Sequence, residues 1–383
     1  MSMKRIGKPA VLGMVAAALV VACGQDPPQS VEPTSGEATP TSQALSGYEA
    51  VVAEIEGLGS EERWSRLVEL AEEEEEEGTL QVYATISGDE IGPLMDGFVE
   101  ATGSDQIKTT SYRAGTTSVL QRISEEESAG ARQVDAVVST GTALQELSNE
   151  GLLQPFETPL AEDLIEDGIH PDWAAIYINL YTAAWNTDLV AESAAPTTWE
   201  EVLSYTAGPV GVEVKSYDWF ATLVTEYFME QQGLSEDEAV ALFMEADMVP
   251  VDGRTALTEF TVAGQFDVAA STYTQNVDKF KAEGAPIDWE PPVEPLLLQP
   301  NGVAPVAESD VPATTLLFID YLLGEEGQEV LVGFERIPTN VNVEGSMTED
   351  YEVVPVDVAE MVDNREKWEG LFAEVTGDPV ASP

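Results

Sequence analysis

The segment AEEEEEEGTLQVYATISGDE, residues 71–90, joins the end of an acidic helix to an apolar strand and a turn. Upstream, Ser60 is the expected N-cap, and the apolar residues of SEERWSRLVELA recur at helical spacing. Gly78 is the expected stop, which places the glutamate run 72–77 in the last turns, where the helix dipole disfavours acids. A solvated acidic face is the ordinary interpretation of such a run.

Short apolar runs alternate with helical patterns along the rest of the chain. Strands are expected at residues 79–86, 107–112, 134–139, 208–214 and 266–271. Helices are expected up to residue 102 and at residues 116–129, 142–149, 219–232, 236–246, 276–282, 313–323 and 358–372. This alternation predicts an α/β fold with a mainly parallel sheet covered by helices. The length of 383 residues favours two lobes.

The net charge is the second feature that constrains the protein. The sequence has 71 Asp and Glu against 16 Lys and Arg, a formal charge of −55, yet 43% of its residues are hydrophobic, as in a folded protein. Self-repulsion on this scale destabilises a compact fold unless it is screened. At about 1 M salt the Debye length falls to about 3 Å, so we expect a halophilic protein. The acidity argues against binding to nucleic acid or to an anionic membrane surface.

The N-terminus resembles a bacterial lipoprotein signal. Lys4, Arg5 and Lys8 precede the apolar run 9–22, which is too short to span a bilayer, and Cys23 follows as the only cysteine. We expect a signal peptide at residues 1–22 and a lipid anchor on Cys23 with a flexible tether, residues 23–59. A free thiol behind an ordinary signal peptide is the alternative. In the lipoprotein interpretation, the lipid on Cys23 is the only membrane contact, and it holds the protein at the outer face of the cytoplasmic membrane.

Six turns are rich in hydroxyl groups, and most of them also contain glycine or a basic residue: TISGD (85–89), RAGTTS (113–118), STGTA (139–143), KSYD (215–218), GRT (253–255) and STYT (271–274). In open α/β sheets ligands bind beyond the carboxyl ends of strands, at helix N-termini, and such turns suit an oxyanion. The candidate ligand-binding residues are Thr85, Ser87, Arg113, Thr116, Ser139, Thr140, Ser216, Tyr217, Arg254, Thr255 and Tyr273. Arg254, and secondarily Arg113, would supply a bidentate contact. The competing interpretations are that the hydroxyls only cap helices and that the arginines pair with surface acids.

Several segments resemble the ferric-type family of solute-binding proteins of ABC importers. They include RWSRLVELAEEEEEEGTLQVYATISGDEIGPLMDGFVEATG, YRAGTTSVLQRISEEESAGARQVDAVVS, AGQFDVAAS and TLLFIDYLLGEEGQEVL, and the likeness covers residues 64–343. The resemblance implies a two-lobed periplasmic-binding-protein-like fold of type II, each lobe a mixed, mainly parallel sheet with flanking helices. It places lobe 1 at residues 60–181, lobe 2 at 182–297, a return to lobe 1 at 298–343, and an acidic C-terminal extension at 344–383.

The iron ligands of the ferric members are not reproduced in this sequence. Those members hold iron with a His, a Glu and two adjacent tyrosines; the matching positions here fall near Ser87, near Thr140 and within STYTQN, which contains only Tyr273. His170, in the loop GIHPDW, is expected to be structural. Direct iron binding is therefore the alternative to an organic oxyanion or an iron chelate, and no metal site or cofactor is expected.

The resemblance implies a monomeric lipoprotein that binds a small solute between its lobes and delivers it to the transmembrane subunits of an ABC permease. An enzyme is the first rival. With one histidine and no G-x-S-x-G, H-E-x-x-H or P-loop motif, a carboxylate-dependent extracellular hydrolase is the form that stays open. A purely structural surface lipoprotein is the second rival.

Overall fold

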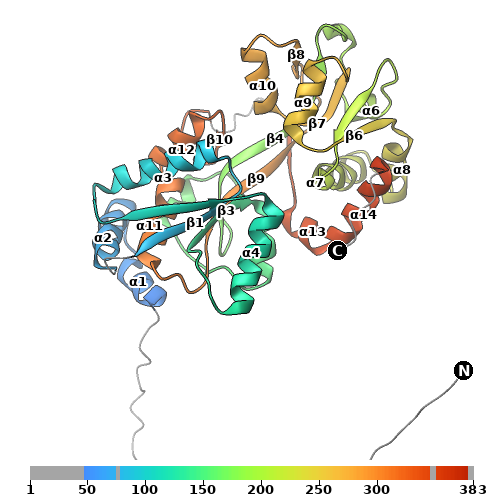
Figure 1. The fold of residues 1–383 in the computed structure, drawn as a ribbon. Coiled ribbons are helices and arrows are strands. Elements are labelled where there is room, and N and C mark those ends of the chain that lie inside the picture. Colours follow the sequence, from blue (N-terminus) through green and yellow to red (C-terminus); the bar gives the residue numbers. More distant parts are fainter. Residues whose placement is uncertain (1–46, 75–77, 346–350, 378–383) are drawn as a thin grey trace, which may run out of the picture. The chain divides into compact units, whose positions relative to one another are not determined.

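The computed structural model describes residues 47–74, 78–345 and 351–377 (Figure 1). Its α-helices are α1 (Gly47–Ile55), α2 (Ser60–Glu73), α3 (Gly88–Thr102), α4 (Thr116–Ala129), α5 (Gly141–Asn149), α6 (Trp199–Leu203), α7 (Tyr217–Thr222), α8 (Glu236–Glu245), α9 (Arg254–Val262), α10 (Thr274–Ala282), α11 (Pro312–Leu323), α12 (Glu325–Val332), α13 (Val358–Asp363) and α14 (Arg365–Thr376). A π-helix, Leu223–Gln231, continues α7, and short 3-10 helices occupy Pro159–Asp163 and Glu192–Ala194.

The strands form one mixed sheet. They are β1 (Thr79–Ala84), β2 (Lys108–Arg113), β3 (Ala136–Thr140), β4 (Ala174–Asn186), β5 (Val210–Glu213), β6 (Met248–Val251), β7 (Val268–Tyr273), β8 (Ile287–Asp288), β9 (Leu296–Pro305), β10 (Ile337–Pro338) and β11 (Val353–Pro355). The main order is β2-β1-β3-β9-β4-β7-β5-β6. We call β2-β1-β3 the first sheet half and β7-β5-β6 the second sheet half; within each half neighbouring strands are parallel.

Two long antiparallel strands, β9 and β4, join the halves. β9 pairs with β3 on one side and with β4 on the other, and β4 pairs with β7. Every residue of β4 is buried, which explains why its sequence AAIYINLYTAAWN is almost continuously apolar rather than alternating. The expected lobe boundaries at 181/182 and 297/298 fall inside these two strands, and the division into lobes stays a prediction.

Each sheet half has its own hydrophobic core. On the first half, alternate residues of β1 face opposite sides: Leu80 and Val82 pack with α2, α3 and α11, whereas Tyr83 packs with α4 and α5. On the second half, Val212 and Val268 pack with α7, α8 and α14. The expected α/β class with a mixed sheet and flanking helices is confirmed by the observed architecture.

Most expected helices and the strands expected at 79–86, 107–112, 134–139, 208–214 and 266–271 match observed elements, but no strand was expected at 174–186 or 296–305, where β4 and β9 lie. The expected helix 116–129 coincides with α4. Ser60 is the first residue of α2 rather than its cap, because Gly59 takes the extended N-cap conformation and accepts the Arg63 N–H. The single helix expected at 358–372 is two helices, α13 and α14, separated by Asn364.

The glutamate run is only partly a solvated face. Glu72 is exposed, and α2 ends at Glu73. Glu74, however, is largely covered and accepts hydrogen bonds from the Ala313 and Thr314 N–H groups, at 2.6 and 3.1 Å, and from the Thr314 hydroxyl at 2.6 Å. Burial raises its pKa, although these donors act in the opposite direction. The expectation of a wholly solvated run is therefore wrong for Glu74, which binds the N-terminus of α11. Residues 75–77 lie outside the described residues.

The C-terminal extension is part of the folded body. β11 runs parallel to β9, with Val354 opposite Leu297, and α14 packs on α7 and α8. The signal peptide, Cys23 and most of the expected tether lie outside the described residues. The described part of the expected tether is not a flexible segment, because it forms α1, which buries Tyr48, Val51 and Ile55 against the first core. Among the helices that are described, none combines the length and apolar character needed to cross a bilayer.

Candidate functional site

A cavity of about 670 Å³ lies at the carboxyl ends of β3, β5 and β7. β3 and the helices α4 and α5, which pack on the first sheet half, contribute Thr116, Thr117, Leu120, Thr140, Thr142, Ala143 and Glu146. The joining strands and the second half contribute Tyr181, Glu213, Val214, Lys215, Tyr217, Asp218, Arg254, Tyr273 and Gln299. The C-terminal helices contribute Val362, Arg365, Glu369, Phe372, Ala373 and Thr376. The position agrees with the general location of ligand sites in open α/β sheets.

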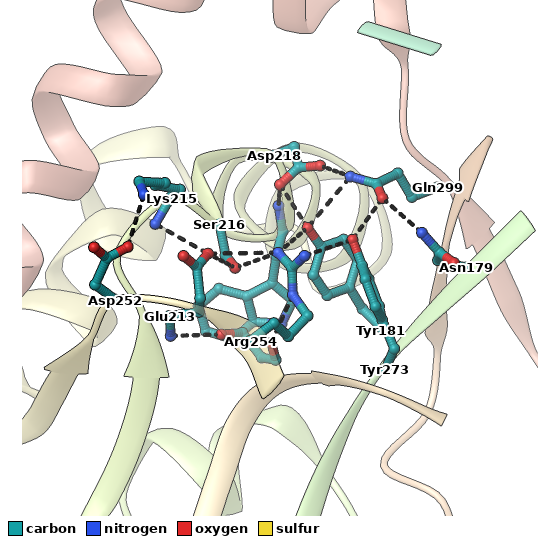
Figure 2. Close-up of polar contacts among 12 residues, drawn as sticks. Asn179, Tyr181, Glu213, Lys215, Ser216, Asp218, Asp252, Arg254, Tyr273 and Gln299 are labelled. Carbon is teal, nitrogen blue, oxygen red and sulfur yellow. Dashed lines mark hydrogen bonds and ion pairs between the residues drawn. The ribbon is translucent and has the colours of Figure 1, made fainter. Parts of the chain in front are cut away.

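Arg254 lines the cavity and lies at the centre of a network of polar side chains, which we call the cavity floor (Figure 2). It is the first residue of α9 and follows Gly253, whose φ of +102° turns the chain from β6 into the helix. Its Nη1 donates to the Tyr273 hydroxyl at 2.7 Å, and its Nη2 donates to the hydroxyls of Tyr181 and Ser216, both at 2.8 Å. Nε donates to the Ser271 carbonyl at 3.3 Å.

Two buried acidic side chains, Glu213 and Asp218, lie around the Arg254 guanidinium. The Glu213 carboxylate lies 3.5 Å from Nη2 and accepts the Ser216 hydroxyl at 3.0 Å. The Asp218 carboxylate accepts the Tyr181 hydroxyl at 2.8 Å and a hydrogen bond from the Gln299 amide. A buried charge of this kind is stable only when its partners are in place, so the floor is a preorganised network.

Gln299 extends this network toward the first sheet half. It lies on β9, accepts the Tyr273 hydroxyl at 2.6 Å and accepts the Asn179 amide at 3.2 Å. The Asn179 carbonyl accepts Nη1 of Arg336 at 3.2 Å, and Arg336 pairs with Glu90 of α3 at 2.7 Å. A continuous chain of polar side chains therefore crosses the two joining strands, and Figure 2 shows its part from Arg254 to Asn179.

The two phenols beside Arg254 are neutral. The rings of Tyr181 and Tyr273 lie 4.8 Å apart between centroids. Burial raises the pKa of both hydroxyls, although Arg254 acts in the opposite direction. A metal ion bound by these oxygens would have to displace the guanidinium and two phenolic protons.

The opposite wall is made of helix N-termini and threonines. Thr116 is the first residue of α4, and Thr140 is the N-cap of α5, where its hydroxyl accepts the Ala143 N–H at 3.4 Å. The Thr142 hydroxyl lies 3.2 Å from that of Thr140. The first N–H groups of both helices have no partner within the helix, so this wall is rich in hydrogen-bond donors.

Five of the predicted ligand-binding residues line the cavity: Thr116, Thr140, Tyr217, Arg254 and Tyr273. Ser216 is completely buried behind them and supports Arg254. The competing interpretation, in which Arg254 pairs with acids at the surface, does not describe this side chain. Its hydrogen-bond partners lie in the cavity floor.

The other predicted residues lie outside the lining of this cavity among the described residues: Thr85, Ser87, Arg113, Ser139 and Thr255. The hydroxyls of Thr85 and Ser139 lie 3.3 Å apart. Ser87 forms a capping box with Glu90 at the start of α3, and Arg113 donates to the Ile86 carbonyl at 3.2 Å. The capping interpretation describes the contacts of Ser87, and a ligand role for these residues stays a prediction.

Sequence reasoning did not find Tyr181, Asp218, Gln299 or Arg365. Tyr181 lies within the continuous apolar run of β4, where it is indistinguishable from a core residue. Gln299 precedes Pro300, Asn301 and Gly302, residues typical of a turn, yet the structure places them inside β9. Arg365 lies in the expected helix 358–372 of the acidic C-terminal extension. Asp218 was one residue from the predicted pair Ser216 and Tyr217, and its place beside a turn was the only available signal.

Within the described part of the chain, no group of three or more His, Cys, Asp and Glu side chains is arranged to hold a metal ion. Tyr273 does have a neighbouring phenol, from β4 rather than from its own turn. The Arg254 guanidinium lies against both phenol rings: its Cζ is 4.1 Å from the Tyr273 ring centroid and 4.8 Å from the Tyr181 ring centroid.

Solved structures with the same fold bind different ligands. Iron-bound HitA from Pseudomonas aeruginosa aligns with a TM-score of 0.65 at 18% identity, over 78% of this chain and 99% of that one. AfuA from Actinobacillus pleuropneumoniae, with fructose-6-phosphate bound, gives 0.64 at 18% identity over 79% and 99%. MotA from A. tumefaciens B6, in complex with glucopine, gives 0.62 at 13% identity over 78% and 100%.

At these identities the solved structures establish the fold alone. No curated protein matches the sequence. The family described as bacterial extracellular solute-binding protein matches residues 134–364, more than half of the chain. These residues include β4, β7, β9 and the whole floor of the cavity. The chain belongs to the bacterial extracellular solute-binding protein family.

Proposed function

We propose that the cavity binds a small organic solute that carries an oxyanion group, or a chelate that carries one, and that the protein delivers it to the permease of an ABC importer. The observation that carries this proposal is the cavity of about 670 Å³ between a donor-rich threonine wall and the Arg254 floor. Its volume is in the range of small-molecule sites, about 300–1,000 Å³.

The charges around the cavity suggest how an anion is held despite the acidic surface. Each basic side chain of the lining has an acidic partner: Arg254 with Glu213, Lys215 with Asp252 and Arg365 with Glu146. A guest anion would therefore depend on the N–H and hydroxyl groups at the starts of α4 and α5, with Tyr217 and Tyr273 against its apolar part. Hydrogen bonds at contact distance are much less sensitive to salt than long-range attraction, which suits a halophilic protein.

The cellular context belongs to the same proposal. A lipid on Cys23 would hold a monomeric protein at the outer face of the cytoplasmic membrane, where it captures the solute, closes and meets the permease. The motifs of the N-terminus and the family membership support this placement. In this role the solute is released unchanged, without a cofactor, which separates a binding protein from the hydrolase considered above.

A thermal-shift screen in molar salt tests the proposal. The panel contains phosphonates, sugar phosphates, organic acids, polyamines and ferric chelates, because a ligand that binds only the folded state raises its melting temperature. A hit is followed by calorimetric titration of the wild type and of Thr116→Val, which removes a hydroxyl from the threonine wall. The matched control is Thr110→Val, which changes an exposed threonine of β2.

We expect an oxyanion-bearing hit, recovered unchanged after incubation, whose affinity falls about tenfold in Thr116→Val and not in Thr110→Val. Hits limited to polyamines, or equal loss in both variants, would contradict the oxyanion site. Direct ferric binding is the second candidate because two phenols converge at Arg254. A stoichiometric response to free ferric ion, with no response to chelates or organic anions, would favour it over our proposal.

A further inference from the structure

The short helix α13 lies between the cores of the two sheet halves. Its first residue, Val358, belongs to the core of the first half, with Leu144 and Trp173. One turn later, Met361 belongs to the core of the second half and is fully buried. The contact of α13 with the start of α5 is close, because a Cβ on Gly141 would come within 3.1 Å of Val358 Cγ1. The helix therefore touches both cores within one turn.

An ion pair adds a second contact at the same place. Arg365, the first residue of α14, donates from Nη1 to the Glu146 carboxylate of α5 at 2.7 Å and from Nε to Glu369 of its own helix at 2.7 Å. The side chains of Arg365 and Glu146 are 41% and 32% exposed. Both residues line the cavity, so the pair joins two of its walls.

The rest of α14 is fixed to the second sheet half. Trp368 is fully buried, and the Phe372 ring stacks on Phe220 of α7 at 5.4 Å between centroids. Lys367 pairs with Glu236 of α8 at 2.7 Å. Because α14 is held by this packing, its ion pair with α5 connects the second half to the first. The family match ends at residue 364, so α14 lies beyond it.

We propose that α13 and the Arg365–Glu146 pair form a latch. The latch holds the two sheet halves at one fixed separation across the cavity when no solute is bound. A latch of this kind works because movement of the first half relative to the second must break the ion pair and separate Val358 from α5. Arg365 is then a positioning residue for the binding site. The role of the latch rests on the proposed function, but its physical existence is independent of any ligand.

Distances between two spin labels, measured by double electron–electron resonance on the ligand-free full chain, test the latch. In a Cys23→Ser background, nitroxide labels are placed at Ser128→Cys on α4 and Ala241→Cys on α8, both exposed positions on opposite sheet halves. The distance distribution is recorded in molar salt for the parent, for Arg365→Gln, for Glu146→Gln and for the double variant. Lys367→Gln is the matched control, because it removes a cation from α14 whose partner is on the second half.

We expect Arg365→Gln and Glu146→Gln to broaden the distribution and to raise the proportion of non-parental distances about two- to fivefold, the range for a partly exposed pair. The double variant should resemble either single variant, because both remove the same interaction. Lys367→Gln should match the parent. Val358→Ala provides an independent variant, for which we expect the same broadening while circular dichroism confirms folding.

Distributions in all folded variants that coincide with the parent would overturn the latch, and so would equal broadening in Lys367→Gln. Neither result would affect the solute screen described above. Conversely, a screen without any hit would leave the distance measurements unchanged, so failure of the latch and failure of the binding function are distinguishable.

Discussion

Glu74 is the one described residue of the glutamate run that contacts a helix of the core. Its carboxylate accepts three hydrogen bonds at the N-terminus of α11, a helix in which every residue is buried. The neighbouring Glu73 is exposed. Two adjacent acids of the same type therefore have different energetic roles, because only one of them satisfies buried backbone N–H groups.

We predict that Glu74→Gln lowers the free energy of unfolding by about 1 kcal/mol at neutral pH. The amide keeps one acceptor oxygen but presents N–H groups to the Thr314 donors, which are then left without an acceptor. Denaturant unfolding in molar salt measures the change. Glu73→Gln is the control, and it should be neutral or slightly stabilising because it removes a like charge; an equal loss in the control would contradict the prediction.

His170 offers a second test at the residue scale, since it is the only histidine. Its ring stacks on Trp173 at 3.7 Å between centroids. Burial lowers its pKa below the usual 6.5, although Asp167 and Asp172 act in the opposite direction. The unfolded chain therefore takes up the proton first, and stability should fall as the pH drops below about 6.5.

A single imidazole signal in an NMR titration in molar salt should show this lowered pKa. The slope of unfolding free energy between neutral and mildly acidic pH should be smaller in His170→Gln than in the wild type. An imidazole pKa above 6.5 would show that the nearby aspartates outweigh burial, against our prediction.

At the scale of elements, the C-terminal helices are the main departure from what the local sequence indicates. The pattern of 344–383 is polar and acidic, and an acidic tail is typically solvated. Nevertheless β11 pairs with β9, and α14 buries two aromatic rings against α7. These few large side chains outweigh the polar composition, because each buried aromatic contributes far more than an exposed acid costs.

We predict that Trp368→Ala lowers the free energy of unfolding by about 3–5 kcal/mol, the usual cost of deleting a buried tryptophan. Trp368 is fully buried and its indole N–H donates to Glu360 at 3.1 Å. Glu366→Ala, an exposed change on the same helix, is the control and should stay within about 0.5 kcal/mol of the wild type. If both variants unfold like the wild type, α14 contributes nothing to the fold.

At the scale of the whole molecule, the formal charge of −55 is the dominant electrostatic feature. The described ion pairs use most of the few basic side chains, for example Arg63 with Asp320 and Arg336 with Glu90. The surplus of acids has no counter-charge within the protein, so solvent ions must supply it.

We predict that the melting temperature rises steeply between about 0.1 M and about 1 M sodium chloride, because the Debye length falls from about 10 Å to about 3 Å. Differential scanning fluorimetry measures it, and sucrose at equal osmolality is the control, since it is excluded from the surface without screening charge. A melting temperature that is constant over this salt range would contradict the halophilic interpretation.

Local signals in the sequence were sufficient for most helices, for β1, β2, β3, β5 and β7, and for the α/β class. They include hydrophobic periodicity, capping residues and glycine stops, which act within a few residues and therefore show in the linear sequence. The turn at Arg254 was found in this way. The chain length favoured two lobes, and the resemblance of whole segments supplied their type and bounds, which periodicity alone does not contain.

Only the tertiary structure decided what surrounds Arg254 and what the C-terminus does. Its partner Tyr181 is 73 residues away in the sequence, and Glu146 and Arg365 are 219 residues apart. Such pairs form because strand register and helix packing bring distant segments together, and no local pattern encodes that encounter. The sequence alone thus determined most of the helices, most strands of the two sheet halves, the acidity and the donor-rich turns. The two joining strands and the assembly of the cavity depended on long-range packing.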